Sequence, residues 1–209
     1  MANGTKGQDS GRENTTVSEK TDSKKKLIID KATEVFAAKG FRSVTMKDIV
    51  EACEISRGGL YLYYGSTEEV FKDVVAAQDA DESDENVEKL LAEATPSQLL
   101  LWFVKEQKKA ILRRKNSLVT AKYEYAFSNR EAGNTKEAKD AFETAVAVLD
   151  NILKRGNESG EFECEDTAMC ARNMMYAIEG MKVCAAEFGL SEKKVDNELL
   201  FIMQQFMEA

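Results

Sequence analysis

Apolar side chains recur at intervals of three and four residues along most of this chain, which is the spacing of one face of an α-helix. No stretch shows the sustained alternation of apolar and polar residues that is typical of a β-strand. A single proline and twelve glycines among 209 residues also favour long helices over sheets. The pattern therefore predicts an all-α protein, and a hydrophobic content of 43% is enough for a substantial core.

Helix start and stop signals divide this pattern into separate elements. Thr95 is a suitable N-cap and Pro96 a suitable first-turn residue, and the helix that follows is apolar on all sides from Leu99 to Val104, which predicts a central, buried position. The acidic run at 79–85 either continues the preceding helix or ends it. We expect helices at 24–40, 45–53, 57–64, 66–78, from 96 into 105–115, 118–128, 135–155, 166–188 and 195–206.

The segment from Thr45 to Tyr64, TMKDIVEACEISRGGLYLYY, has the layout of two short helices joined by a tight turn. Thr45 can cap the first helix, with Asp48 in the capping-box position. Cys53-Glu54-Ile55 forms the turn, and Ser56 caps the second helix. In a helix-turn-helix the second helix enters the major groove of DNA, so this segment predicts a DNA-binding protein.

This motif and its flanks resemble the TetR family of bacterial transcriptional regulators. The segment 24–40, KKKLIIDKATEVFAAKG, looks like the family's first helix, and FRSVT at 41–45 looks like its turn into the second. At 65–71, GSTEEVF looks like the entry into the fourth helix, where Ser66 and Glu69 form a capping box. The resemblance implies an N-terminal three-helix helix-turn-helix head and a larger C-terminal helical domain for effector binding and dimerisation.

We accordingly divide the chain into a tail at 1–23, a DNA-binding domain at 24–70 and an effector-binding and dimerisation domain at 71–209. The tail is rich in Gly, Ser, Thr and charged residues, which predicts disorder, and it lacks the apolar core of a signal peptide.

Three positions depart from the family pattern. Glu54 stands where the turn usually has glycine, which costs on the order of 1 kcal/mol if the left-handed backbone is kept. Gly65 and Thr67 stand where basic residues are common, so two phosphate contacts are missing. Leu62 stands where the family often has an aromatic residue or histidine.

Several residue types in and around the motif suit DNA contacts. The Arg57 guanidinium can pair with guanine or bind a phosphate, and Gly58 and Gly59 let the helix start approach the duplex closely. By the resemblance, Tyr61 and Tyr63 reach the backbone or a thymine methyl, whereas Leu60 and Tyr64 face the core of the head. The full set of expected DNA-binding residues is Arg42, Thr45, Lys47, Ser56, Arg57, Gly58, Gly59, Tyr61, Leu62 and Tyr63.

The charge distribution bears on this prediction, because a net charge of −8 at first argues against a nucleic-acid partner. Residues 1–65 contain 11 Lys and Arg against 9 Asp and Glu, a balance of +2, whereas the remainder contains 18 against 28, a balance of −10. The head is therefore weakly basic, and the acidic body disfavours nonspecific DNA binding. No apolar span of 18 residues exists, so we expect no membrane insertion and a cytoplasmic protein.

The four cysteines, Cys53, Cys164, Cys170 and Cys184, have no CxxC spacing, and the chain contains no histidine. We therefore expect no metal site and no cofactor. Reduced thiols packed as small hydrophobes are one interpretation, and a thiol-based redox switch is the other. The absence of histidine also restricts acid–base chemistry to carboxylates and lysine, and no motif for an enzyme is present.

In family members the middle region of the chain surrounds a ligand cavity, which makes its aromatic residues candidate pocket walls. Core packing is the alternative for each of them. These candidates are Trp102, Phe103, Tyr123, Tyr125, Phe127, Phe142 and Tyr176.

The last two predicted helices carry apolar residues at alternating steps of four and three, a heptad seam suited to packing against another helix. An intrachain core stripe would have the same spacing, but the resemblance implies a dimer built from these two helices. The predicted interface is Cys170, Met174, Ala177, Met181, Cys184, Phe188, Leu199, Ile202 and Phe206.

The sequence thus predicts a homodimeric regulator of transcription that is released from a palindromic operator by a small, apolar effector. A helical adaptor that has lost DNA binding is the alternative, because Glu54, Gly65, Thr67 and the acidic balance all weaken the head. A cysteine-based redox sensor is the alternative within the regulator class.

Overall fold

The structure is a computed structural model that describes residues 10–81, 93–128, 135–204 and 206. Every regular element within these ranges is a helix, as the apolar spacing predicts. The helices are α1 (Ser10–Lys39), α2 (Met46–Cys53), α3 (Arg57–Tyr61), α4 (Thr67–Asp81), α6 (Pro96–Leu112), α7 (Val119–Ser128), α8 (Thr135–Ser159), α9 (Thr167–Phe188) and α10 (Glu192–Met203).

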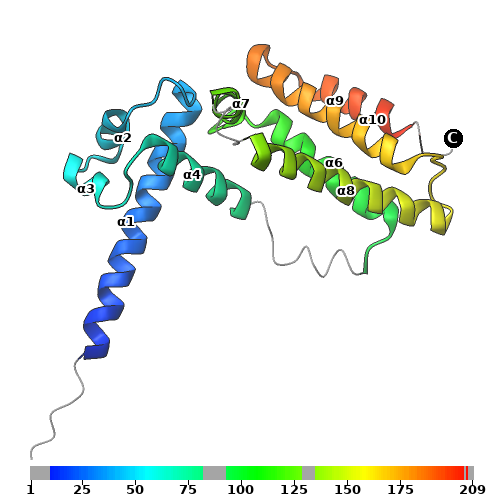
Figure 1. The fold of residues 1–209 in the computed structure, drawn as a ribbon. Coiled ribbons are helices and arrows are strands. Elements are labelled where there is room, and N and C mark those ends of the chain that lie inside the picture. Colours follow the sequence, from blue (N-terminus) through cyan, green and yellow to red (C-terminus); the bar gives the residue numbers. More distant parts are fainter. Residues whose placement is uncertain (1–9, 82–92, 129–134, 205, 207–209) are drawn as a thin grey trace, which may run out of the picture.

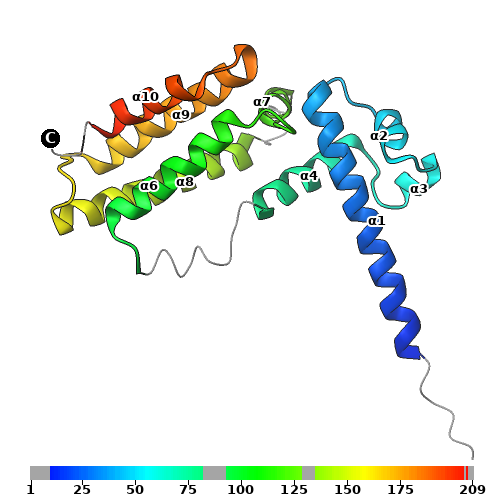
Figure 2. The same ribbon diagram turned by 180° about the vertical axis from the view of Figure 1, so that it is seen from behind.

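The helices form a head and a body, each with its own hydrophobic core (Figures 1 and 2). The head contains α1 to α4, and the body contains α6 and α8 to α10. α7 lies between them and contributes Ala121 and Tyr125 to the core of the head, to which Leu118, just before the helix, also belongs. The predicted architecture of a small N-terminal helix-turn-helix head and a larger helical domain is confirmed.

Two predicted boundaries of the head differ from the structure. α1 begins at Ser10, so the segment 10–23 is helical and only 1–9 of the predicted tail lies outside the described residues. Once the apolar stripe of α1 is packed, each further helical residue adds a hydrogen bond, and the helix can extend into polar sequence. At the other end, Phe71 and Val74 are buried in the core of the head, which therefore continues past residue 70.

The inward-facing residues of the head are the ones that the sequence predicts. Leu60 and Tyr64 are buried together with Ile28, Ala32 and Phe36, and Phe41 packs against the same cluster. Leu60 has no exposed surface, so it anchors the short helix α3 to the rest of the head.

The start of α2 is fixed by the predicted capping box. The Thr45 side chain accepts a hydrogen bond from the Asp48 backbone N–H, and the Asp48 carboxylate accepts one from the Thr45 N–H at 2.8 Å. Lys39, at the end of α1, donates to the same carboxylate at 2.6 Å. These hydrogen bonds, the one from Lys39 first, hold the pKa of Asp48 well below its usual range. The carboxylate therefore stays ionised and joins α1 to α2.

The turn of the helix-turn-helix contains a left-handed residue that is not glycine. Glu54 ends α2 with φ of 54° and ψ of 35°, and its backbone N–H donates to the carbonyls of Glu51 and Val50. A side chain at this φ crowds the following carbonyl, so the predicted strain is present.

The body is built around α6, which packs against α8, α9 and α10. The predicted cap at Thr95 is confirmed as a capping box with Gln98. Leu99, Leu100, Phe103 and Val104 are buried, but Leu101 is half-exposed, so α6 is not covered on all sides. In the polar second half of the helix, Lys105 and Lys109 are exposed, whereas Ile111 is buried.

The connection from α8 to α9 is held by close backbone packing. The Phe162 ring lies against Gly156, where any added Cβ atom would collide with it, so this position in the last turns of α8 requires glycine. The Glu163 backbone N–H donates to the Phe206 carbonyl at 3.1 Å, which ties the end of the chain to the same connection.

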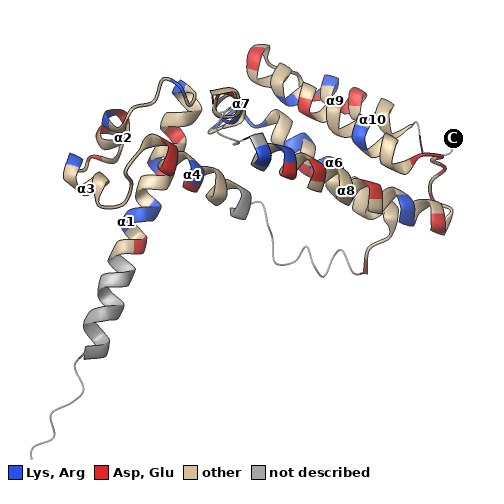
Figure 3. Cartoon of the chain, viewed as in Figure 1, with Lys and Arg blue, Asp and Glu red and all other residues tan. Residues whose placement is uncertain are grey.

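Within the described part of the chain, no helix is both long and apolar enough to cross a bilayer. Basic and acidic side chains are interspersed along the helices of the body, so the charge is not gathered on one of them (Figure 3).

Replacing Glu54 with glycine is expected to stabilise the protein by about 1 kcal/mol, because glycine adopts the left-handed turn without steric cost. Glu51→Gly, three residues earlier and inside α2, is the control and is expected to lower stability by about the same amount. Urea denaturation of both variants measures the difference. A loss of stability in Glu54→Gly would contradict the assignment of strain to this turn.

Candidate DNA interface and effector pocket

The helix α3 is short, and its start is organised by a single cap. The Ser56 hydroxyl oxygen accepts a hydrogen bond from the Gly59 backbone N–H at 3.1 Å. The Ser56 O–H is not used in this cap, so it can still donate a hydrogen bond to a group outside the protein. The Thr45 hydroxyl, in contrast, donates to Asp48 at 2.7 Å and is used within its own cap. Of the two predicted hydroxyl contacts, Ser56 is therefore the better placed to meet a phosphate.

The outer face of α3 exposes the chemistry that the sequence predicts. The Arg57 guanidinium lies over the Tyr61 ring, 5.6 Å from its centroid, which holds the charge at the start of the helix. Nothing lies within 4 Å of the place where a Cβ atom of Gly58 would be, so a DNA backbone could approach there. Leu62 is 84% exposed, and Tyr63 is half-buried behind it. An exposed leucine is costly in water but suits a thymine methyl group.

Lys47 and Arg42 are placed very differently. Lys47 is exposed on α2 and forms only a loose ion pair of 3.6 Å with Glu51, so its ammonium group is available to a phosphate. Arg42 lies between head and body, where its Nε donates to the Ser128 hydroxyl of α7 at 2.8 Å and its backbone N–H donates to Glu124 at 2.9 Å. Arg42 is exposed and only its Nε and backbone N–H are used at this junction, so its contact with DNA stays a prediction.

A cavity of about 430 Å³ lies between α6, α7, α8 and α9, with Gln78 of α4 at its edge. Two of the seven predicted pocket residues, Tyr123 and Phe142, line it. The other apolar walls are small or aliphatic: Ala110, Leu118, Val119, Ala126, Ala138, Ala141, Ala145 and Met175. Because many of these lining residues are alanines, their short side chains do not fill the cavity.

The remaining five predicted pocket residues lie elsewhere. Phe103 and Trp102 pack in or against the core of the body, and Tyr125 is in the core of the head. Phe127 is half-exposed, and Tyr176 is 58% exposed, with its ring stacked on the outer side of Phe142 at 5.2 Å. Core packing, the alternative for each aromatic residue, therefore holds for three of them.

The polar groups of the cavity were not apparent from the sequence. Tyr123 donates to Glu179 at 3.0 Å, and Lys182 donates to the same carboxylate at 2.8 Å. Burial, followed by the nearby Glu179 charge, raises the pKa of Tyr123, so its hydroxyl remains a donor. Gln107 also lines the cavity, and its Oε1 is the one buried side-chain oxygen or nitrogen of the described residues that has no partner. Charged residues on surface helices are common, so sequence alone gave no sign that these faced inward.

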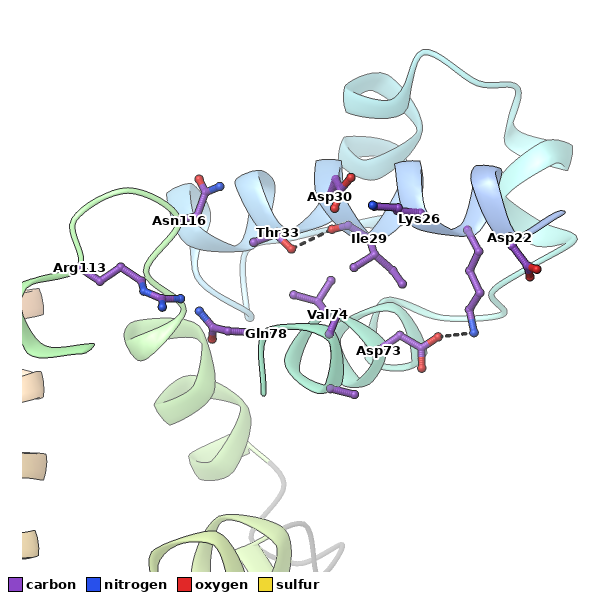
Figure 4. A pocket seen from close by; sticks show the side chains of 13 residues that line it. Asp22, Lys26, Ile29, Asp30, Thr33, Asp73, Val74, Gln78, Arg113 and Asn116 are labelled. Atoms are coloured by element: carbon purple, nitrogen blue, oxygen red, sulfur yellow. Dashed lines mark hydrogen bonds and ion pairs between the residues drawn. The ribbon is translucent and has the colours of Figure 1, made fainter. Parts of the chain in front are cut away.

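A larger, more open groove of about 740 Å³ lies between α1, α4 and the connection from α6 to α7 (Figure 4). Charged side chains of both signs line it, and Lys25 and Asp73 pair across it at 2.8 Å. Gln78 and Arg113 line both this groove and the smaller cavity. Most residues of the groove belong to α1 and α4 of the head, whereas the smaller cavity lies in the body and has the apolar lining that suits a ligand.

The structure divides the predicted dimer interface into three groups. Met174, Met181, Leu199 and Phe206 are buried in the core of a single subunit and offer no surface to a partner. Cys170, Ala177, Cys184 and Ile202 are half-buried, and of these Cys170 and Ile202 pack against that core, whereas Phe188 is 69% exposed. A different apolar stripe is exposed on α9, and its residues each precede a predicted interface residue by one position: Met169, Tyr176 and Val183. Leu200 and Phe201 are exposed on α10.

Two family models match the chain. The model described as bacterial regulatory proteins of the tetR family matches residues 28–74, which span α1 to α4. The model described as the tetracyclin repressor-like C-terminal domain matches residues 99–196, which span most of the body.

The chain is 30% identical over 182 residues to the HTH-type transcriptional regulator YfiR of Bacillus subtilis, covering 85% of this chain and 86% of that protein. The fold resembles that of a transcriptional regulator from Saccharomonospora viridis in complex with choline, with a TM-score of 0.76 and 18% identity, over 90% of this chain and all of that one. It also resembles a TetR transcription regulator from Haloarcula marismortui, with a TM-score of 0.73 and 13% identity at the same coverage.

Arg57→Ala and Lys47→Ala are expected to weaken DNA binding in different ways. Arg57→Ala removes a guanidinium that contacts a base. It should reduce the free energy of binding to the preferred sequence by about 1–3 kcal/mol and relax the base preference at one position. Loss of Lys47 should weaken all duplexes alike and lower the salt slope of binding by about one. Fluorescence anisotropy at several salt concentrations measures both.

The matched control is Lys193→Ala, since Lys193 is an exposed lysine on α10, outside the head, and its loss should leave DNA affinity unchanged. If Arg57→Ala weakened every sequence equally, Arg57 would be a phosphate contact instead of a base contact.

Proposed function

Because the chain belongs to the TetR family of bacterial transcriptional regulators, we propose that it is a homodimeric repressor that a small-molecule effector releases from a palindromic operator. The observation that carries the proposal is the double role of α7. It lines the cavity with Val119, Lys122, Tyr123 and Ala126, and it packs into the core of the head with Ala121 and Tyr125. A DNA-binding protein of this kind would act in the cytoplasm.

DNA binding by a single head would be weak, and the exposed apolar stripe supports a dimer. Met169, Tyr176 and Val183 follow one another at intervals of seven residues along α9, and each is at least 43% exposed. The space above Gly180, on the same side of the helix, is empty, so a partner helix could approach closely there. Phe201 on α10 is 63% exposed. Apolar surface of this kind on a soluble protein is typical of an interface.

The cavity supports binding of a small, mainly apolar molecule with a few polar groups. Its volume is in the range of ligand sites, and the lining combines alanine, leucine and phenylalanine side chains with Glu179 and Lys182. The unpartnered Gln107 oxygen could accept a hydrogen bond from such a ligand, which would remove the cost of its burial. A protein of similar fold has been captured with choline, which agrees with a small-molecule site in this fold.

Three successive residues of α7 connect the cavity to the head. Tyr123 donates to Glu179 at the cavity, Glu124 accepts from the Arg42 backbone N–H, and Tyr125 donates to Glu68 of α4 at 3.1 Å. Gly40 gives the Glu124 carboxylate room, because a Cβ atom there would lie 2.5 Å from it. An effector that competes for Glu179 would move Tyr123, and the same helix would then shift its contacts with the head.

Selection of duplexes from a random DNA pool tests the proposal. The wild-type protein is expected to enrich a palindrome, because a twofold dimer presents α3 to two half-sites. A folded dimer that enriches no sequence would support the adaptor hypothesis and contradict the regulator.

The matched variants for this experiment are Phe201→Glu and Val148→Glu. Both replace an exposed apolar residue, but only Phe201 lies on the proposed interface. Phe201→Glu is therefore expected to sediment as a monomer and to lose the palindrome, whereas Val148→Glu keeps both.

A compound that fills the cavity is expected to raise the melting temperature and to lower operator affinity, since it binds one conformation better than the other. Ala145→Trp should abolish both effects by occupying the cavity, and Ala147→Trp, on the exposed side of the same helix, should retain them. With one compound found by screening, thermal-shift measurements report the melting temperature and fluorescence anisotropy reports the operator affinity. A compound that binds without changing operator affinity would contradict effector release.

A further inference from the structure

Two of the four cysteines are in direct contact. The Sγ atoms of Cys164 and Cys170 lie 2.8 Å apart, which is about 0.8 Å longer than the bond of a disulfide. The other two thiols are elsewhere: Cys53 is in the core of the head, and Cys184 is on α9, four helical turns beyond Cys170.

The backbone around this pair is fixed by hydrogen bonds, so the contact does not depend on a loose loop. Asn157 at the end of α8 clamps Cys164 on both sides, accepting from its N–H at 3.1 Å and donating to its carbonyl at 2.7 Å. Cys170 lies in the first turn of α9, where its N–H donates to the Asp166 carbonyl at 3.0 Å. The Asp166 side chain caps the same turn through the Met169 N–H.

The two thiols have unequal surroundings. Cys164 is 5% exposed, and burial together with the neighbouring Cys170 thiol raises its pKa to about 12. Cys170 is half-buried. Because the thiolate is the reactive form and an oxidant must reach it, Cys170 is the thiol that reacts first.

We propose that Cys164 and Cys170 are an oxidation site at which a hydroperoxide forms a reversible disulfide within one subunit. The Cys170 thiolate attacks the peroxide and takes up one oxygen to become a sulfenic acid. The leaving oxygen takes up the proton that the Cys170 thiol lost, which gives an alcohol, or water when the oxidant is hydrogen peroxide. The Cys164 sulfur then displaces hydroxide from that sulfenic acid, and the hydroxide leaves as water with the Cys164 proton. In total, two thiols lose two electrons and two protons to one peroxide, and a thiol reductant reverses the change.

The disulfide would join the connection after α8 to the first turn of α9. This connection lies at the end of the body away from the head (Figure 1). Oxidation therefore acts first on the start of the helix that carries the exposed apolar stripe, and it is expected to raise the melting temperature by closing a short loop in the unfolded chain.

Treatment of the purified full chain with hydrogen peroxide, followed by alkylation and mass spectrometry of the intact protein and its peptides, tests the inference. We expect a loss of two mass units, alkylation of two thiols instead of four, and a cross-linked peptide that joins Cys164 to Cys170. A thiol reductant should restore all four thiols. Free cysteine in the same buffer serves as the control that the oxidant is active.

Single variants test the order of the two steps. Cys164→Ser should leave a sulfenic acid on Cys170 that a cyclic diketone probe labels, and Cys170→Ser should leave Cys164 unlabelled. Asn157→Ala keeps all four thiols but releases the clamp, and it is expected to slow disulfide formation severalfold in protein that circular dichroism shows to be folded. Cys184→Ser should behave as wild type.

The inference would be overturned by four alkylatable thiols after peroxide has consumed free cysteine, by disulfides between chains, or by a bridge that includes Cys53 or Cys184. Because the readout is thiol chemistry, each of these results is independent of whether the protein binds an operator or an effector.

Discussion

One aromatic cluster, to which α7 contributes, holds the head of this regulator to its body. Tyr125 of α7 meets Phe41 edge-on at 4.9 Å and Phe71 of α4 at 5.2 Å, and Phe71 in turn meets Phe36 of α1 at 4.9 Å. Aromatic pairs of this geometry contribute about 0.5–1.5 kcal/mol each beyond the area they bury. The position of α3 relative to the body depends on this contact, because Tyr125 lies on α7, which also lines the cavity of the body.

The cluster is apolar, but polar contacts on its rim fix its orientation. Glu124 and Ser128 of α7 hold Arg42, and the Tyr125 hydroxyl reaches Glu68. Burial, followed by the Glu68 hydrogen bond, raises the pKa of Tyr125, so this hydroxyl also remains a donor at neutral pH. An apolar cluster tolerates small rotations, whereas directed hydrogen bonds favour discrete arrangements. The proposed release by an effector would require α7 to move between two such arrangements.

Much of the head could be predicted from the sequence because its signals are local. The caps at Thr45 and Ser56, the buried Leu60 and the left-handed Glu54 all follow from residue types within a few positions of one another. The role of Arg42 could not be predicted in this way, since its partners Glu124 and Ser128 are more than eighty residues away in sequence.

The body was harder to predict for a related reason. On α9, the stripe through Cys170, Ala177 and Cys184 and the stripe through Met169, Tyr176 and Val183 have the same heptad spacing and differ by one residue. Spacing identifies an apolar stripe but does not say whether it faces the core of its own subunit or a partner, and only the packing of α6 and α8 decides between them. The cavity raises the same difficulty, because it exists where side chains are small, and an alanine gives no signal of the space that it leaves.

These features together suggest how a weakly basic head can still select a sequence. The few phosphate contacts available to α2 and α3 limit the nonspecific, salt-dependent part of the affinity, and the acidic body limits it further. A single head of this kind would bind DNA poorly. Two heads fixed in one dimer bind as a unit, because the second half-site is then met at a high effective concentration. In the proposed dimer, specificity would depend on the spacing between the two copies of α3, and the proposed effector would change that spacing by displacing α7 in each subunit.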